Sequence, residues 1–180
     1  MSLSCWSYLL GALLSVGGLF VLFAPAPSAR CLKAFPRCRW LGVVLSTVAW
    51  LWAAWATTQM GLDFLEPYKK FAWVIAIVCI PLTWWVLDNL LPCRAWGAIL
   101  CLFPYGLLHV ARVHDSPWRL VLVVFAYLCI VKGMIQLLYP WKQRQWLDWA
   151  MANPSRFRLF GIGNLLVGVL FVVLGAMVLR

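Results

Sequence analysis

The chain has 180 residues, of which 65% are hydrophobic and 11% are charged, and its formal net charge is +10. Ordinary soluble domains carry roughly 25% charged residues, so the composition excludes that class and indicates a membrane protein. The positive charge does not indicate nucleic-acid binding, because the Lys and Arg residues lie mostly between apolar segments, where anionic lipids attract them.

Six apolar segments approach the length of a membrane-spanning helix, which is about 20 residues with a range of about 17–25. The predicted fold is therefore an all-α integral membrane protein with six transmembrane helices. Pro81 and Pro104 interrupt the third and fourth segments, and a four-span alternative would make residues 71–111 re-entrant. The first segment is predicted to be a retained span, since it lacks the basic start of a signal peptide. The segments are 6–24, 40–60, 71–87, 95–111, 118–139 and 159–179.

A short motif recurs three times between apolar segments: a proline, then an arginine, then a glycine three residues after that arginine. It predicts three tandem helical hairpins, 1–60, 61–116 and 117–180, within a single membrane domain. Proline is favoured at a helix start, arginine reaches the headgroups, and glycine lets a neighbouring helix come close. The copies are Pro36…Arg39…Gly42, Pro92…Arg94…Gly97 and Pro154…Arg158…Gly161.

Small residues also recur inside the spans. Gly18 and Gly133 each precede a proline by seven residues, and small residues repeat every seven positions in the first and last spans. Such stripes let helices pack closely, so they either join these two spans or dock another protein. The predicted helix-packing residues are Gly11, Gly18, Gly161, Gly168 and Gly175.

The basic residues predict the orientation of the chain. Nine of them fall on the side of the three motifs and five on the other, which favours extracytoplasmic termini. Trp141 begins a segment expected to lie in the inner interface as a short helix. The residues predicted to contact lipid headgroups are Arg39, Arg94, Arg158 and Trp141.

Lys132 lies well inside the predicted span 118–139, and a charged residue at such a depth indicates function by default. Gln136 follows one turn later on the same face. A ligand or ion site is one interpretation, and the other is that Lys132 extends its long stem to the headgroups. The predicted polar intramembrane cluster comprises Lys132, Gln136, Asn164, Thr83 and Asp88.

No metal site, cofactor or enzymatic activity is predicted. The gap between Cys31 and Cys38 does not match zinc-ligand spacing, and the acidic residues form no intramembrane pair. His109 is the histidine that lies in a span, so paired haem ligation within the subunit is excluded. Whether His109 contacts a quinone or a pigment stays open.

The third hairpin carries a distinctive series of short motifs: Lys132-Gly133, Leu138-Tyr139-Pro140-Trp141, Asn153-Pro154 and Arg158-Leu159-Phe160-Gly161. In these residues it resembles DUF2065, the YjeT-like family of small two-span bacterial inner-membrane proteins. The family tends to carry a glutamate where this chain has Lys132. The resemblance implies a topology and a bacterial inner-membrane location, and it implies no reaction.

These observations predict a non-enzymatic accessory or scaffold subunit that packs against another membrane protein or a second copy of itself. A carrier or substrate-binding membrane component for a small solute is the alternative. A lipid-interacting protein is the second alternative, because thirteen tryptophans and basic connectors suit the membrane interface.

Overall fold

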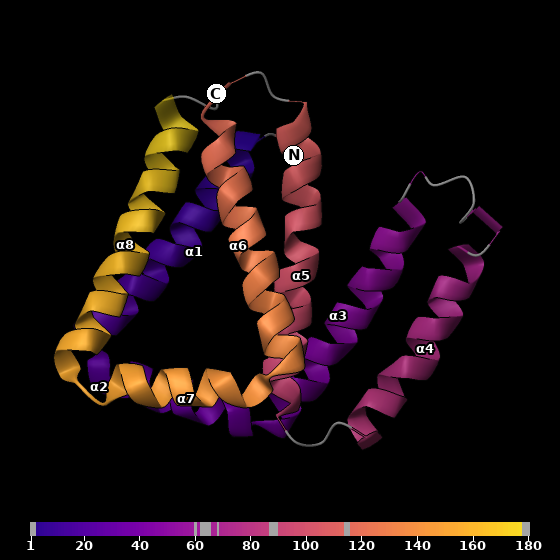
Figure 1. Cartoon of the computed structure of the whole chain (residues 1–180), viewed down its shortest axis with the longest axis horizontal. Helices are drawn as coiled ribbons and strands as arrows, with labels where there is room; N and C mark the ends of the chain where they lie inside the picture. Colours follow the sequence, from indigo (N-terminus) through magenta and orange to yellow (C-terminus); the bar gives the residue numbers. More distant parts are fainter. Residues whose placement is uncertain are drawn as a thin grey trace. The chain divides into compact units, whose positions relative to one another are not determined.

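The computed structural model describes residues 3–59, 61, 66–67, 69–86, 90–113 and 116–177. These residues form helices and no strand. Six of the helices are long and apolar enough to cross a membrane, so the chain is an all-α multi-span membrane protein, as predicted (Figure 1). They are α1 (Leu3–Phe23), α3 (Arg39–Gln59), α4 (Lys69–Val86), α5 (Leu91–Arg112), α6 (Arg119–Leu138) and α8 (Pro154–Met177).

Shorter helices form two of the connections. The helix α2 (Pro25–Ala34) and the 3-10 helix η1 (Phe35–Arg37) join α1 to α3, and α7 (Pro140–Met151) joins α6 to α8. Three of these helices, α2, α7 and α8, begin at a proline, whose missing N–H costs nothing in the first turn. Each copy of the repeated motif falls at the start of a long helix, which explains its position in the sequence.

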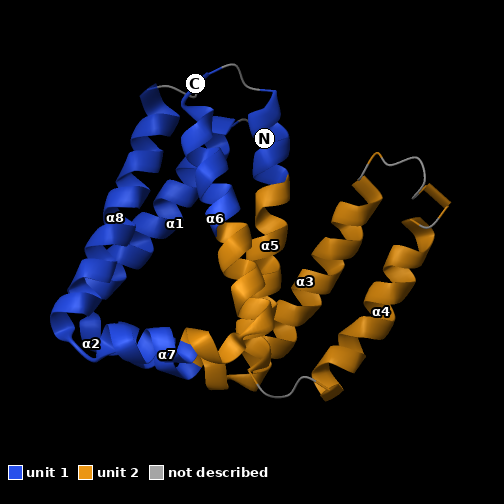
Figure 2. Ribbon diagram, viewed as in Figure 1, with its two compact units in different colours: residues 1–34, 106–128, 144–180 blue, residues 35–105, 129–143 orange. Residues whose placement is uncertain are grey.

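The described chain divides into two compact units (Figure 2). Unit 1 comprises residues 1–34, 106–128 and 144–180, and unit 2 comprises residues 35–105 and 129–143. The long helices α5 and α6 each contribute to both units. The units therefore do not follow the predicted hairpin boundaries after residues 60 and 116.

In unit 1, α1 and α8 pack against each other as an antiparallel pair (Figure 1). A Cβ atom added to Gly18 would lie 2.8 Å from the carbonyl oxygen of Gly161. One added to Gly168 would lie 2.9 Å from the carbonyl oxygen of Gly11. Because these neighbours are backbone atoms, no side-chain rotation can make room, and the close approach requires glycine at both positions.

A buried hydrogen bond accompanies this contact. The Ser7 hydroxyl group is fully buried and donates to the Phe171 carbonyl oxygen across the two helices at 2.6 Å. The Phe171 ring also meets Phe125 of α6 edge-on, with ring centroids 4.9 Å apart. An interhelical hydrogen bond of this kind contributes about 0.6–2 kcal/mol in a membrane. The contact between α1 and α8 is therefore both closely packed and polar at one point.

In unit 2, α5 and α6 approach each other in the same way. A Cβ atom added to Gly97 would lie 2.9 Å from the Gly133 carbonyl oxygen, and one added to Gly133 would lie 2.7 Å from the Gly97 carbonyl oxygen. The Cys101 thiol donates to the Ile130 carbonyl oxygen at 3.7 Å, which continues the antiparallel register. The start of α5 is thus level with the end of α6.

The helix α3 of unit 2 packs against α4. The indole N–H of Trp84 donates to the Ser46 hydroxyl oxygen at 3.2 Å, which joins the two helices through their polar side chains. Near the start of α3, a Cβ atom on Gly42 would lie 3.0 Å from the Cδ atom of Pro92, at the start of α5. All three motif glycines are therefore buried against another helix.

These contacts explain why the units and the predicted hairpins differ. The close helix pairs are α1 with α8, α3 with α4, and α5 with α6, and each pair joins two different hairpins. Glycine contacts mark the pairs α1 with α8 and α5 with α6, whereas α4 contains no glycine and meets α3 through other side chains. Two of the pairs, α3 with α4 and α5 with α6, join spans that follow one another along the chain.

The glycine contact predicts that one alanine substitution in α8 destabilises the protein and that a second one does not. Gly168→Ala should lower the free energy of unfolding by about 1–3 kcal/mol, because its Cβ atom would collide with the backbone of Gly11 and Ser15. Gly163→Ala is the matched control, since a Cβ atom there meets nothing within 4 Å. Thermal unfolding in detergent measures both, and equal melting temperatures would contradict the packing described.

Candidate functional site

The described residues of the predicted polar cluster lie on α4, α6 and α8. Thr83, on α4 of unit 2, donates its hydroxyl hydrogen to the Ile80 carbonyl oxygen of its own helix at 2.8 Å. Asn164 lies on α8 of unit 1 and is half-buried. Asp88 lies outside the described residues. The hydrogen bond of the Thr83 hydroxyl group thus stays within α4.

Lys132 and Gln136 share α6 but differ in burial. Lys132 is exposed rather than enclosed among the helices. The flexible stem of lysine can carry the amine toward a polar region, which costs less than enclosing the charge among apolar helices. Gln136 is only 5% exposed and donates from Nε2 to the Oε1 atom of Gln143 in α7. Gln143, rather than Lys132, is the partner of Gln136.

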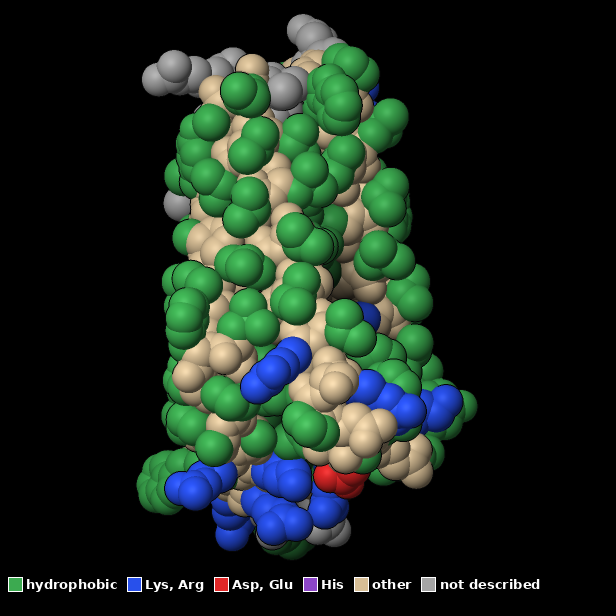
Figure 3. Space-filling view, turned by 90° about the vertical axis from the view of Figure 1, so that its left-hand side faces the viewer, with side chains coloured by type: hydrophobic (Ala, Val, Ile, Leu, Met, Phe, Trp, Pro, Cys, Tyr) green, Lys and Arg blue, Asp and Glu red, His purple; other side chains and the backbone are tan. Residues whose placement is uncertain are grey.

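The residues predicted to contact lipid headgroups also differ from one another in burial. Arg39, Arg158 and Trp141 are exposed near the starts of α3, α8 and α7, respectively. On the face shown in Figure 3, Lys and Arg side chains gather at the lower end, below an area in which hydrophobic side chains predominate. This distribution suits the boundary between hydrocarbon and water. Arg94 is half-buried and so stands apart from the other three.

Two polar atoms of unit 2 are buried without a hydrogen bond. The Nε atom of Arg94, a donor, and the Oε1 atom of Gln136, an acceptor, have no partner among the described residues. A buried polar group without a partner costs about 1–3 kcal/mol, and more when it is charged. These two atoms form the most unusual polar feature of the described chain.

The backbone just before Arg94 is also unusual. Leu90 has a φ angle of 62°, in the left-handed region that residues with a side chain seldom adopt. Its carbonyl oxygen accepts hydrogen bonds from the backbone N–H groups of Cys93 and Arg94, at 3.1 and 3.3 Å. The first turn of α5, which carries Arg94, therefore starts from a strained residue. Such strain persists where the surrounding structure holds it.

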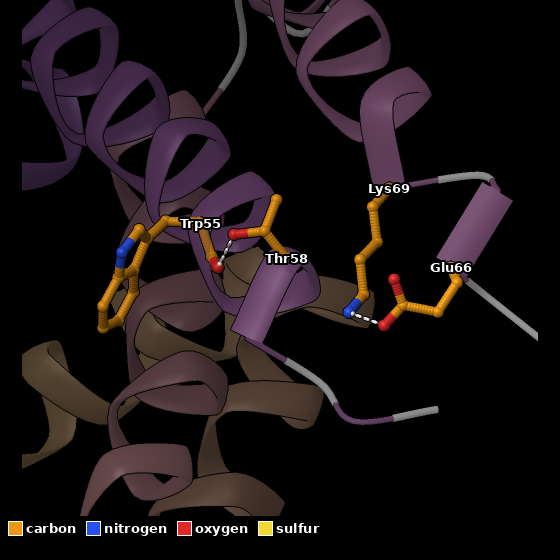
Figure 4. Close-up of polar contacts among 4 residues, drawn as sticks. All are labelled: Trp55, Thr58, Glu66 and Lys69. Carbon is orange, nitrogen blue, oxygen red and sulfur yellow. Dashed lines mark hydrogen bonds and ion pairs between the residues drawn. The ribbon is translucent and has the colours of Figure 1, made fainter. Parts of the chain in front are cut away.

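An ion pair joins the first residue of α4 to the segment before it (Figure 4). The Lys69 amine lies 2.5 Å from a Glu66 carboxylate oxygen, three residues earlier. Near the end of α3, the Thr58 hydroxyl group donates to the Trp55 carbonyl oxygen at 2.7 Å (Figure 4). Glu66 is well exposed, and exposed pairs contribute at most about 1 kcal/mol. This end of unit 2 therefore has ordinary surface chemistry.

No group of three or more His, Cys, Asp or Glu residues that could hold a metal ion occurs in the described part of the chain. His109 is exposed on α5. Comparisons with protein-family models, with curated proteins and with solved structures found no match to the chain. The functional argument therefore rests on the geometry of the chain itself.

Sequence reasoning missed Gln143 and Leu90, and it missed Ser7 in unit 1. A signal for Ser7 is present, because Ser7, Gly11 and Ser15 are small residues spaced by four, as at close helix contacts in membranes. Gln143 lies in a connector rich in polar residues, so no pattern distinguishes it. The positive φ of Leu90 has no sequence signal, because Gly or Asn is the usual residue there.

The different environments of Lys132 and Gln136 predict different mutational effects. Lys132→Met should change the free energy of unfolding by no more than about 0.5 kcal/mol, as is usual for an exposed side chain. Gln136→Leu should cost about 1–3 kcal/mol, because it leaves Gln143 without its partner. Both are measured by thermal unfolding in detergent. A large loss of unfolding free energy in Lys132→Met would instead support the polar cluster that the sequence predicts.

Proposed function

We propose that the protein is a non-enzymatic accessory or scaffold subunit of a membrane assembly and that α4 is the helix that contacts its partner. The observation that carries this proposal is Pro81, which lies inside α4 and is exposed. Its ring has no N–H group, so the carbonyl oxygen of Ile77, four residues earlier, loses its helical hydrogen bond. Hydrocarbon chains offer no donor to such an oxygen.

A second proline provides an internal comparison. Pro104 lies inside α5 but is fully buried, so the Leu100 carbonyl oxygen that it deprives of a donor lies within a packed part of the chain. Membrane helices tolerate proline where neighbouring helices or polar side chains satisfy the freed backbone. Pro104 is enclosed by the chain itself, whereas the exposed Pro81 would be enclosed only by a helix from another chain.

The remaining surface of α4 agrees with this interpretation. Ala76 is the buried residue of the helix, while large apolar side chains on several sides of it are exposed. An apolar surface can face lipid, so exposure alone does not indicate a partner. Exposure together with the backbone oxygen at Ile77 supports a helix that supplies a hydrogen-bond donor, from another membrane protein or a second copy of this chain.

The proposed location is the bacterial inner membrane with extracytoplasmic termini. The excess of basic residues on the side of the three motifs and the resemblance of the third hairpin to the DUF2065 family support this placement. The two matching glycine contacts, Gly18 with Gly161 and Gly133 with Gly97, support an origin by repetition of one hairpin. Both contacts pair a motif glycine with the glycine that precedes a proline by seven residues.

Photo-crosslinking tests the role of α4. A photoreactive amino acid at Ile77, which is 65% exposed beside Pro81, should form a protein adduct in native membranes. Val16 of α1, which is 66% exposed, is the matched control and should react with lipid. An adduct of twice the chain's mass would identify a homo-oligomer, and another mass would identify a different protein. If position 77 reacts as position 16 does, α4 faces lipid and the proposal fails.

Cysteine labelling tests the orientation. Cys5 of α1 and Cys31 of α2 are both exposed, so variants that keep one of these cysteines and lack the others report on the two sides. In intact cells a membrane-impermeant maleimide should label Cys5 and leave Cys31 unlabelled. Permeabilised cells, in which both should react, provide the control. Labelling of Cys31 with protection of Cys5 would show the inverse topology.

A further inference from the structure

The two unpartnered polar atoms of unit 2 belong to the same region of the helix pair α5 and α6. The Gly97 contact places the Cβ atom of Gln136 within 3.0 Å of a Cβ atom built on Gly97. Arg94 lies three residues before Gly97, almost one turn nearer the start of α5. Because the helices are antiparallel, the turn that carries Arg94 is level with the last turn of α6, which begins near Gln136.

The chemistry of these atoms is complementary to one kind of ligand. The buried Nε–H group of Arg94 requires an acceptor, and the guanidinium charge favours an anionic one such as a phosphate oxygen. The Oε1 atom of Gln136 requires a donor, while Nε2 of the same side chain is already bonded to Gln143. A ligand that satisfies both atoms therefore carries a phosphate and, beside it, an N–H or O–H group.

Beyond the accessory role, we infer that this end of α5 and α6 binds the headgroup of a phospholipid whose phosphate is linked to a hydrogen-bond donor. Phosphatidylethanolamine has this chemistry, because its ammonium group donates close to the phosphate. Phosphatidylcholine offers the same phosphate to Arg94, but its methylated nitrogen has no hydrogen to donate to Gln136. The predicted signature of the site is therefore discrimination between these two lipids.

Three features separate this site from general attraction of lipids to basic side chains. Gln136 is neutral and 5% exposed, so it cannot act through long-range charge. Arg94 is half-buried, whereas the arginines at the equivalent motif positions, Arg39 and Arg158, are exposed. The carbonyl oxygen of the strained Leu90 accepts a hydrogen bond from the backbone N–H of Arg94 and so holds the turn that carries the guanidinium group.

Native mass spectrometry of the purified full-length chain tests the inference. Phosphatidylethanolamine and phosphatidylcholine with identical acyl chains are added separately to the delipidated protein. Phosphatidylethanolamine should bind about tenfold more tightly than phosphatidylcholine, because one hydrogen bond of about 1.4 kcal/mol confers that factor. Gln136→Leu should reduce binding of phosphatidylethanolamine to the level of phosphatidylcholine. Arg94→Leu should weaken both lipids, because both carry the phosphate.

Two control variants separate the site from its surroundings. Gln143→Leu removes the bonding partner of Gln136 but keeps the free acceptor atom, so the tenfold preference should persist. Arg158→Leu removes an exposed arginine of α8 in unit 1 and should leave the preference unchanged. Retention of the preference in Gln136→Leu, or equal binding of the two lipids by the unaltered chain, would overturn the inference.

Competition with soluble glycerophosphoethanolamine shows whether the site accepts a soluble phosphodiester or requires a membrane lipid. If it competes with the lipid, and the competition disappears in Gln136→Leu, the site accepts a soluble phosphodiester. If it fails to compete while the lipid preference holds, the acyl chains are also required, and the ligand is a membrane lipid. Either result supports the site, and neither depends on a partner protein, since the purified chain is measured alone.

Discussion

Contact between backbones at glycine is the interaction on which the rest of this structure depends. Apolar helices gain little from the hydrophobic effect when they meet inside lipid, so they must associate through close packing and hydrogen bonds. Gly18 with Gly161, and Gly97 with Gly133, bring whole helices close enough for those short-range forces to act. The Ser7 and Phe171 hydrogen bond forms because α1 and α8 are already this close.

The same close packing limits where polar side chains can lie. Helices that meet at glycine leave little room between them, so a long charged chain such as that of Lys132 lies outside the contact. Gln136 faces Gly97 and is enclosed, and it bonds to Gln143 in the following helix. Arg94 is half-buried, and its Nε atom has no hydrogen-bond partner among the described residues. Packing therefore determines which polar groups remain available to a ligand.

Much of the fold could be predicted from the sequence, because span length and apolar composition are local properties. The six spans and the helix starts at Pro25, Pro140 and Pro154 follow from such rules. Which span pairs with which is not local. The stripe through Gly161, Gly168 and Gly175 indicates that a helix comes close, and the sequence left open whether that helix was α1 or another protein.

The candidate site was less predictable for a related reason. Residue type and depth brought Lys132 and Gln136 together in the prediction, since they lie one turn apart on the same helix. In the structure Gln136 lies opposite Gly97 and is buried, whereas Lys132, four residues earlier on α6, is exposed. The burial of Arg94 and the strain at Leu90 likewise depend on how α5 starts beside its neighbours, which no spacing rule describes.

The pairing of spans across hairpins has a consequence for shorter versions of the chain. Since α1 meets α8 and α5 meets α6, a piece that holds only residues 117–180 would keep the glycines of α6 and α8 uncovered. Units that cannot bury their own faces are stable only beside further copies. Such a piece is therefore expected to associate with further copies of itself, so that contacts between molecules replace the contacts within one chain.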